Sequence, residues 1–232
     1  MRPFHPTPPK MVHTLRALAW LLRYPDAPLR DAAPDLAAAL RTEAALPGAR
    51  LAELDALIAR VIRGAPLQVE AEYVDLFDRS RRTALHLFEH VHGDSRDRGP
   101  AMVDLVQTYE RAGLLLAPGE LPDYLPVVLE YASTQPPAQA REFLREVAHV
   151  VRAIFSALVE RGSPYAAVMA AVLDLAGERC ERIELPAEPA LDEAWAEPAA
   201  FDGCSTQGQS RADAPQPIHI VRSPRGQPRA AA

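Results

Sequence analysis

The 232-residue sequence has only two cysteines, Cys180 and Cys204, and both lie near its C-terminal end. So few cysteines form neither a disulfide framework nor a cysteine-based zinc pattern, and they fit a reducing cytosol best. Lysine is also scarce, because Lys10 is the only one, and the 25 basic residues are outnumbered by 31 acidic residues. The net charge of -6 argues against a nucleic-acid-binding protein, which normally has a basic face.

Long hydrophobic runs are missing as well. The apolar stretch 17–22 ends at Arg23 and is too short to cross a bilayer, so it fits one face of an amphipathic helix. We find no export signal and expect a soluble, cytoplasmic protein without direct membrane insertion. The sequence also lacks a G-x-S-x-G nucleophile motif, a Walker phosphate loop and a dinucleotide-binding fingerprint, which makes an enzyme the less favoured class.

Apolar residues recur at helical spacing from about residue 11 to about residue 182, and no alternating strand pattern is present. The sequence therefore predicts an all-α fold, with residues 1–184 forming a single helical-bundle domain of about nine helices. The expected helices are 11–22, a short one behind Pro34 with Leu36 and Leu40, 51–62, 69–77, 83–89, 100–113 beginning at Pro100, 122–132 beginning at Pro122, 143–158, and one beginning at Ser163-Pro164 and continuing to 175.

The composition changes after Glu184, where prolines break any helix and Gly, Ser and Gln become frequent. We expect residues 185–232 to form a flexible, disordered tail. Within it, Leu191, Trp195 and Phe201 could form a short docking helix, and a transient helix without a partner is an equal alternative.

Polar and titratable residues gather in segment 88–102, which contains two histidines, two arginines and three carboxylates. Such a density inside an otherwise apolar helical pattern indicates a functional site or an ordered polar network. Ser95 lies beside Asp94 with His92 close by, but neighbours in one loop rarely form a serine triad with an oxyanion hole.

One enzyme hypothesis remains, because residues 86–90 match the H-x-x-E-H pattern of inverted zinc peptidases. On a helix, His86 and His90 would share a face, as two zinc ligands must, and Glu89 would lie between them. A third ligand is not obvious, so a small metal-dependent hydrolase is the alternative function and a metal site is not the favoured interpretation.

A recognition loop is the third interpretation of the same segment. Asp94, Asp97 and Glu89 can pair with Arg96 and Arg98, which would hold the loop rigid ahead of the following helix. The remaining exposed heads would then contact a charged or amphipathic peptide.

Two stretches resemble the NarJ chaperones, which belong with the TorD and DmsD redox-enzyme maturation chaperones. The first is YVDLFDR at 73–79, followed by FEHVHGDSRDRGPAMVDL at 88–105. The second is ELPDYLP at 120–126, followed by Leu129-Glu130-Tyr131. The resemblance extends from about Leu15 to Gly177, and the segment around Trp195 is weakly similar.

The resemblance implies an all-helical protein that is neither an enzyme nor a part of the finished enzyme complex. Such a chaperone binds the immature catalytic (alpha) subunit of respiratory nitrate reductase, mainly at its N-terminal segment. It delays membrane docking of that subunit and keeps it competent for insertion of the bis-molybdopterin guanine dinucleotide cofactor. No cofactor is expected to be bound permanently.

The client-binding residues that we predict come from both stretches. They are Glu89, His90, His92, Asp94, Arg96, Asp97, Arg98, Asp123 and Tyr124. Each of them could equally serve only to order the loop. Tyr124 departs from the family pattern, which often has a histidine there, so a pH switch at this position is doubtful.

Overall fold

A computed structural model of the chain describes residues 10–93 and 95–185. These residues form nine α-helices and one 3₁₀ turn and contain no strand, which confirms the predicted all-α fold. The elements are α1 (Val12–Leu21), α2 (Ala27–Glu43), α3 (Gly48–Arg63), α4 (Pro66–Phe77), η1 (Arg81–Thr83), α5 (Leu87–Val91), α6 (Arg98–Arg111), α7 (Leu125–Thr134), α8 (Pro137–Glu160) and α9 (Ala166–Ala176). The predicted tail, with Trp195 and Cys204, lies outside the described residues.

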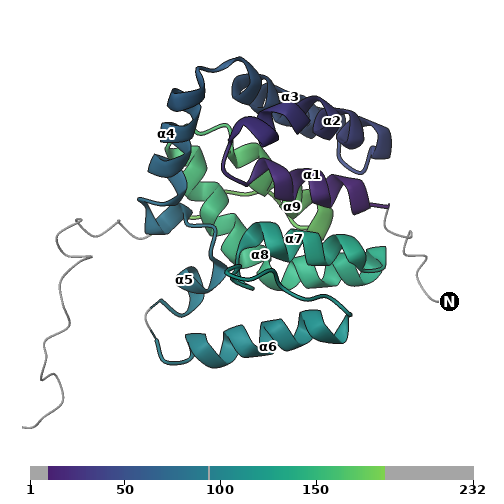
Figure 1. Cartoon of the computed structure of the whole chain (residues 1–232), viewed down its shortest axis with the longest axis vertical. Coiled ribbons are helices and arrows are strands. Elements are labelled where there is room, and N and C mark those ends of the chain that lie inside the picture. Colours follow the sequence, from purple (N-terminus) through teal and green to yellow (C-terminus); the bar gives the residue numbers. More distant parts are fainter. Residues whose placement is uncertain (1–9, 94, 186–232) are drawn as a thin grey trace, which may run out of the picture. The chain divides into compact units, whose positions relative to one another are not determined.

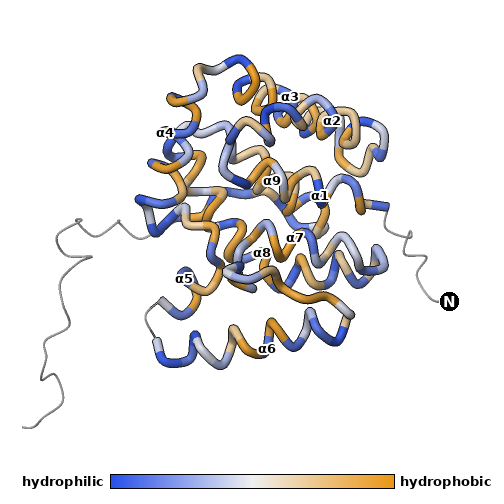
Figure 2. Tube along the Cα trace, viewed as in Figure 1, coloured by the Kyte–Doolittle hydropathy of each residue, from blue (hydrophilic) through white to orange (hydrophobic). Residues whose placement is uncertain are grey.

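Helix α9 is the central element of the described fold (Figure 1). Nine of its eleven residues are buried, and its trace is mainly hydrophobic in Figure 2. It packs most extensively on α8 and also contacts α1 and α3, while α7 packs on α1 and α8. Helix α2 contacts both α1 and α3. No helix among the described residues is both long and apolar enough to cross a membrane.

Helix α2 is much longer than the short helix predicted behind Pro34. The Asp26 carboxylate accepts a hydrogen bond from the Leu29 N–H at 3.0 Å, so the helix begins at Ala27 and Pro34 lies in its interior. An interior proline removes one backbone hydrogen bond and costs about 3 kcal/mol. Burial of Leu29, Ala33 and Leu40 between neighbouring helices offsets this cost.

The start of α9 also differs from the prediction. Gly162 reverses the chain after α8 with a φ of 61°, a left-handed conformation that favours glycine. Ser163 then accepts a hydrogen bond on its side-chain oxygen from the Tyr165 N–H at 3.3 Å. The predicted capping serine is therefore present, but regular helix begins only at Ala166.

Two of the predicted helix starts were wrong for a common reason. Residues 83–89 were expected to be one helix, yet residues 84–86 are not helical, with a bend at Leu85, and α5 begins at Leu87. Pro122 was expected to begin a helix, yet α7 begins at Leu125. The segments that lead into α5 and α7 pair with each other instead of extending their helices.

Helix α6 lies at the edge of the described fold, beside the segment that leads into α7 (Figure 1). It begins at Arg98, two residues before the predicted start at Pro100. Tyr109 is its only buried residue, and the predicted inner residues Met102, Leu105 and Val106 are only half-buried.

Candidate functional site

The two sequence stretches that carry the family resemblance meet through their backbones. An isolated antiparallel bridge joins His86 and Tyr124. The Leu87 N–H donates to the Asp123 carbonyl at 3.0 Å, and the Leu125 N–H donates to the Leu85 carbonyl at 2.9 Å. The rings of His86 and Tyr124 stack with their centroids 5.2 Å apart. This pairing fixes the start of α5 against the start of α7.

Asp123 is the buried centre of this junction. Its side chain has no exposed surface, and one carboxylate oxygen accepts a hydrogen bond from the Phe88 N–H at 3.1 Å. That N–H is among the unpaired donors at the start of α5, so Asp123 caps the helix from a distant part of the chain. The same oxygen lies 4.0 Å from the Arg98 guanidinium. Asp123 is fully buried in this structure, so the predicted client contact stays a prediction and its carboxylate has no exposed surface to offer a client.

His86 lies on the other side of the buried carboxylate. Its Nδ1 atom faces the second Asp123 oxygen at 3.5 Å, and neither atom has a closer partner among the described residues. The nearby Asp123 carboxylate raises the pKa of His86, with a further contribution from the charge of Glu89, while burial and Arg98 act in the opposite direction. Protonated His86 is therefore stabilised by the folded structure.

The H-x-x-E-H pattern does not form a metal site. His86 precedes α5 in extended conformation, so it does not share a helix face with His90. The His90 Nε2 atom instead bonds to the Ala84 carbonyl at 2.8 Å, which ties α5 to the extended segment. Among the described residues, no group of three His, Cys, Asp or Glu side chains is arranged to hold a metal ion. The geometry on which the hydrolase alternative depended is absent from this part of the chain.

The remaining predicted loop residues differ in how accessible they are. Glu89 and Arg98 form the predicted ion pair at 3.8 Å, and both are partly exposed. Asp97 is exposed and accepts a hydrogen bond from Ser95 at 3.3 Å rather than pairing with an arginine. Arg96 is exposed, and the half-buried His92 ring packs edge-on against another aromatic ring. Asp94 lies outside the described residues.

We predict that the His86–Asp123 contact makes stability depend on pH. The pKa of His86 is raised in the folded protein, so its contribution is fully present below about pH 6.5 and is lost as the pH rises through the folded-state pKa. Urea unfolding of wild type and His86→Asn should thus differ more at pH 6 than at pH 8.5. His149→Asn, which changes an exposed ring on α8, is the matched control. A stability difference for His86→Asn that stays constant with pH would refute this interpretation.

A cavity formed by described residues adjoins the second stretch, residues 120–131. It has a volume of about 460 Å³ and lies between α1, α7 and the segment 114–120. We call it the α1–α7 cavity. Its wall combines apolar, aromatic and charged side chains and is formed by Arg16, Trp20, Tyr109, Leu114, Leu115, Leu116, Ala117, Glu120, Val127, Glu130, Tyr131, Ser133 and Thr134.

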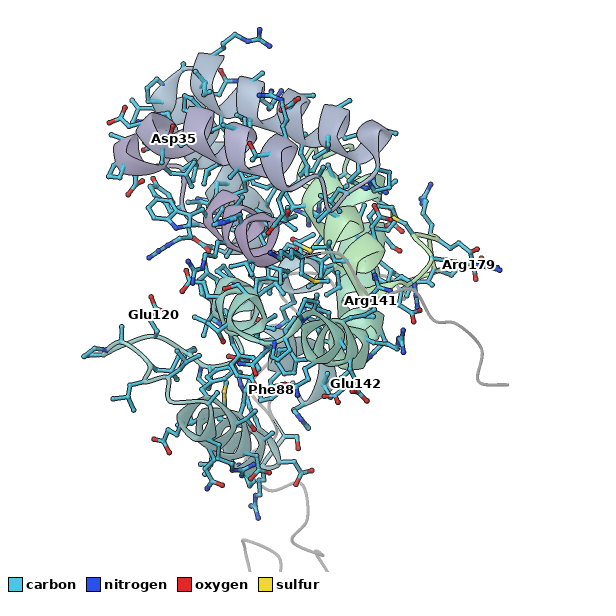
Figure 3. The ribbon with its side chains drawn as sticks, turned by 90° about the vertical axis from the view of Figure 1, so that its right-hand side faces the viewer. Asp35, Phe88, Glu120, Arg141, Glu142 and Arg179 are labelled. Atoms are coloured by element: carbon cyan, nitrogen blue, oxygen red, sulfur yellow. The ribbon has the colours of Figure 1, made fainter. Side chains whose placement is uncertain are left out.

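Two carboxylates give the α1–α7 cavity an acidic character. Partial burial raises the pKa of Glu130, because the charged form is less well solvated there. Arg16 also lines the cavity, and its Nε atom donates to the Ser133 hydroxyl at 3.2 Å. Glu120 lies on the segment between α6 and α7 (Figure 3). A positively charged group entering this cavity would offset the negative charge of both glutamates.

Most of these cavity residues were not predicted from the sequence to be functional. Glu120, Glu130 and Tyr131 belong to the quoted second stretch, so their membership in a motif was an available signal. Trp20 fitted an ordinary core position of an amphipathic helix, and Leu115 lies in a segment without helical periodicity. Only the packing of α1 against α7 brings these residues to one wall.

Comparison with known proteins indicates the family of this chain. The profile of the nitrate reductase delta subunit family matches residues 25–171. The nitrate reductase molybdenum cofactor assembly chaperone NarJ of Escherichia coli K12 is 41% identical over 174 residues, which cover 75% of this chain and 73% of that protein. The probable chaperone NarW of the same strain is 42% identical over 163 residues, which cover 70% and 68%.

A solved structure supports the fold independently. A redox enzyme maturation protein from Archaeoglobus fulgidus superimposes with a TM-score of 0.51 at 20% identity, covering 72% of this chain and 94% of that one. The related proteins are named as assembly chaperones and not as catalysts, which supports the prediction that the chain is not an enzyme. By the match over residues 25–171 and by these identities, the chain belongs to the nitrate reductase delta subunit family, the family of the NarJ-type assembly chaperones.

Proposed function

We propose that this protein is a system-specific assembly chaperone for the molybdenum cofactor of a nitrate reductase. It binds the immature catalytic (alpha) subunit, mainly at the N-terminal segment, keeps it competent for insertion of bis-molybdopterin guanine dinucleotide, and delays its docking at the membrane. It then leaves, and it is not a part of the final enzyme. Family membership and the names of the related chaperones support this proposal.

The observation that carries the proposal is the α1–α7 cavity. An amphipathic helix binds a groove by inserting apolar anchors and placing its charged residues at the rim. Here Trp20, Leu115 and Tyr131 supply apolar and aromatic surface, and Leu115 is 84% exposed. Glu120 and Glu130 supply negative charge on the same wall. The client segment suited to this cavity is an amphipathic helix with basic residues beside its apolar face.

The loop before α6 supplies a second set of contacts in this proposal. In this proposal, the accessible polar side chains of the loop contact polar groups of the client. They belong to Glu89, His92, Arg96, Asp97 and Arg98, and we also assign Asp94 to this set. These contacts act through charge and hydrogen bonds and transfer no proton.

Two of the predicted residues take a positioning role in this proposal. His90 bonds to the Ala84 carbonyl, and Asp123 accepts a hydrogen bond from the Phe88 N–H. We infer that both hold the loop in place for client contact. The half-buried Tyr124 stacks on His86 and stays a proposed client contact.

The molybdenum cofactor is the cargo of this process and is destined for the client. We propose that the chaperone acts in the cytoplasm, before the catalytic subunit reaches the membrane. The scarcity of cysteine, with Cys180 and Cys204 as the only two, supports a reducing compartment.

Calorimetric titration with a peptide that copies the N-terminus of the same organism's nitrate reductase catalytic subunit tests the proposal. We expect saturable one-site binding. The double variant Glu120→Gln with Glu130→Gln should weaken it about tenfold, because rim and partly buried charges contribute on the order of 1–2 kcal/mol.

The matched control is Glu142→Gln with Glu146→Gln, which removes the same charge from exposed positions on α8. Figure 3 shows Glu142 on a part of the surface separate from Glu120. Equal weakening by both double variants would mean that peptide binding depends on the net charge of the protein and not on the α1–α7 cavity. Folded protein that gives no heat with a soluble peptide would contradict client binding.

A further inference from the structure

A second, smaller cavity lies where the two sequence stretches meet the end of α1. Its volume is about 260 Å³, below the range of about 300–1,000 Å³ that is typical for small-molecule sites, so it suits a single side chain. We call it the aromatic cavity. Four aromatic rings and an imidazole dominate its wall, which is formed by Tyr24, Tyr73, Phe77, Asp78, Leu85, His86 and Tyr124.

The rings of the aromatic cavity are held in place by contacts with one another. Tyr73 packs against Tyr24 with centroids 5.7 Å apart and against Phe77 at 4.8 Å. The Tyr73 hydroxyl donates to the Leu22 carbonyl at 2.7 Å, and the Tyr124 hydroxyl approaches the same oxygen at 3.4 Å. The wall is therefore preorganised, which lowers the entropy lost on binding.

The same ring contacts exclude a flat heterocycle as the best occupant. A planar base needs two parallel rings with an open slot between them. The stacked pair here, His86 and Tyr124, is in mutual contact at 5.2 Å, and the Tyr24–Tyr73 pair is edge-on at 86°. A compact group that approaches ring faces from the open side fits this wall better.

Asp78 gives the aromatic cavity its charge. It is the residue that follows α4, so its carboxylate adds to the partial negative charge at the C-terminal end of that helix. The carboxylate is exposed, and it makes no ion pair or side-chain hydrogen bond in the described part of the chain. The adjacent Arg79 pairs with Asp75 instead, at 2.7 Å.

We propose that the aromatic cavity binds one cationic side chain of the client, an arginine guanidinium or a lysine ammonium, between the ring faces and the Asp78 carboxylate. Aromatic rings attract cations through the negative potential of their faces, and an unpaired carboxylate adds a charge-assisted hydrogen bond. The inference rests on the proposed function for its client. It adds a subsite, bounded by α4 and the end of α1, that selects a basic residue at one position of the client segment.

Two probes test this inference on the full chain. The first is N-acetyl-arginine methylamide, with its neutral citrulline analogue and guanosine monophosphate as comparisons, followed by NMR shifts of the tyrosine and histidine rings. The second is the client peptide, with each basic residue replaced in turn by norleucine. Both are used at pH 8.5, because a protonated His86 would place a positive charge on the wall next to Asp123, Glu89 and Arg98.

We expect the arginine probe to shift the rings of Tyr24, Tyr73 and Tyr124 saturably and the citrulline analogue to leave them unchanged. Asp78→Asn should abolish the shifts and weaken peptide binding about tenfold, because it removes the charge-assisted hydrogen bond to the cation. Asp35→Asn removes the same charge from an exposed position on α2 outside the cavity and should leave both the shifts and peptide binding unchanged.

The outcomes separate this inference from the proposed function. Peptide binding that Asp78→Asn does not weaken would overturn the cation subsite and leave the chaperone function standing. Ring shifts by arginine without any peptide binding would support the subsite and overturn the proposed client. Equal shifts by citrulline, or stronger shifts by guanosine monophosphate, would overturn the assignment of the cavity to a cation.

Discussion

Asp123→Ala is expected to lower the free energy of unfolding by about 3 kcal/mol, since it removes a buried charged partner and leaves a helix-terminal N–H unsatisfied. The carboxylate is fully buried and accepts a hydrogen bond from the Phe88 N–H at the start of α5. His86 and Arg98 lie on either side of it. The loss should appear as a lower urea midpoint and as faster amide exchange in residues 84–93 than in α9. Client binding should weaken too, because we propose that Asp123 holds the loop before α6 in place.

Two variants show whether the effect belongs to the buried carboxylate. Asp123→Asn keeps an acceptor for the Phe88 N–H and removes the charge, so its loss of stability should be smaller. Asp97→Ala changes an exposed carboxylate in the first stretch and should shift stability by less than about 0.5 kcal/mol. If Asp97→Ala and Asp123→Ala destabilise equally, Asp123 is not the centre of the junction.

Tyr109→Ala is expected to release α6 while the rest of the helices stay folded. Tyr109 is the only buried residue of α6, its hydroxyl donates to the Pro122 carbonyl at 2.8 Å, and its ring lies 4.8 Å from that of Tyr131. Truncating a buried aromatic side chain costs about 3–5 kcal/mol. Because so few other contacts hold α6, we expect amide exchange in residues 98–111 to accelerate about a hundredfold or more, which hydrogen-exchange mass spectrometry measures.

Exchange in α9 is the internal control for this variant, because its amides report on opening of the whole domain. Tyr109→Phe removes only the hydroxyl and should cost about 1 kcal/mol. If Tyr109→Ala speeds exchange equally in α6 and α9, then α6 unfolds together with the core and is not a separate unit. Tyr109 also lines the α1–α7 cavity, so its truncation should weaken client binding.

The contacts of Tyr109 and Asp123 both involve the segment that leads into α7. Pro122 accepts the hydrogen bond from Tyr109, and the next residue, Asp123, caps α5. Tyr124 follows and forms part of the aromatic cavity. One short segment thus contacts α6, the start of α5 and both proposed client subsites.

Local sequence patterns determined most of the helical architecture. The apolar spacing in 51–62 and 143–158 predicted α3 and α8 because helical periodicity is a property of neighbouring residues. The composition and the two quoted stretches also indicated the family, which the match over residues 25–171 supports. The Glu89–Arg98 ion pair was predicted correctly, since the two residues lie close together in the sequence.

The tertiary structure decided what those stretches do. The sequence predicted helix at 83–89 and at Pro122, yet long-range pairing between Leu85, Leu87, Asp123 and Leu125 replaces the first turns of both helices. The sequence also predicted Asp123 as a client contact, which stays a prediction, but it did not indicate that packing buries this carboxylate as a helix cap. Both cavities combine residues from α1 or from the turn after it with residues about a hundred positions later in the chain. Such contacts depend on how the helices pack, and no local pattern of residues encodes them.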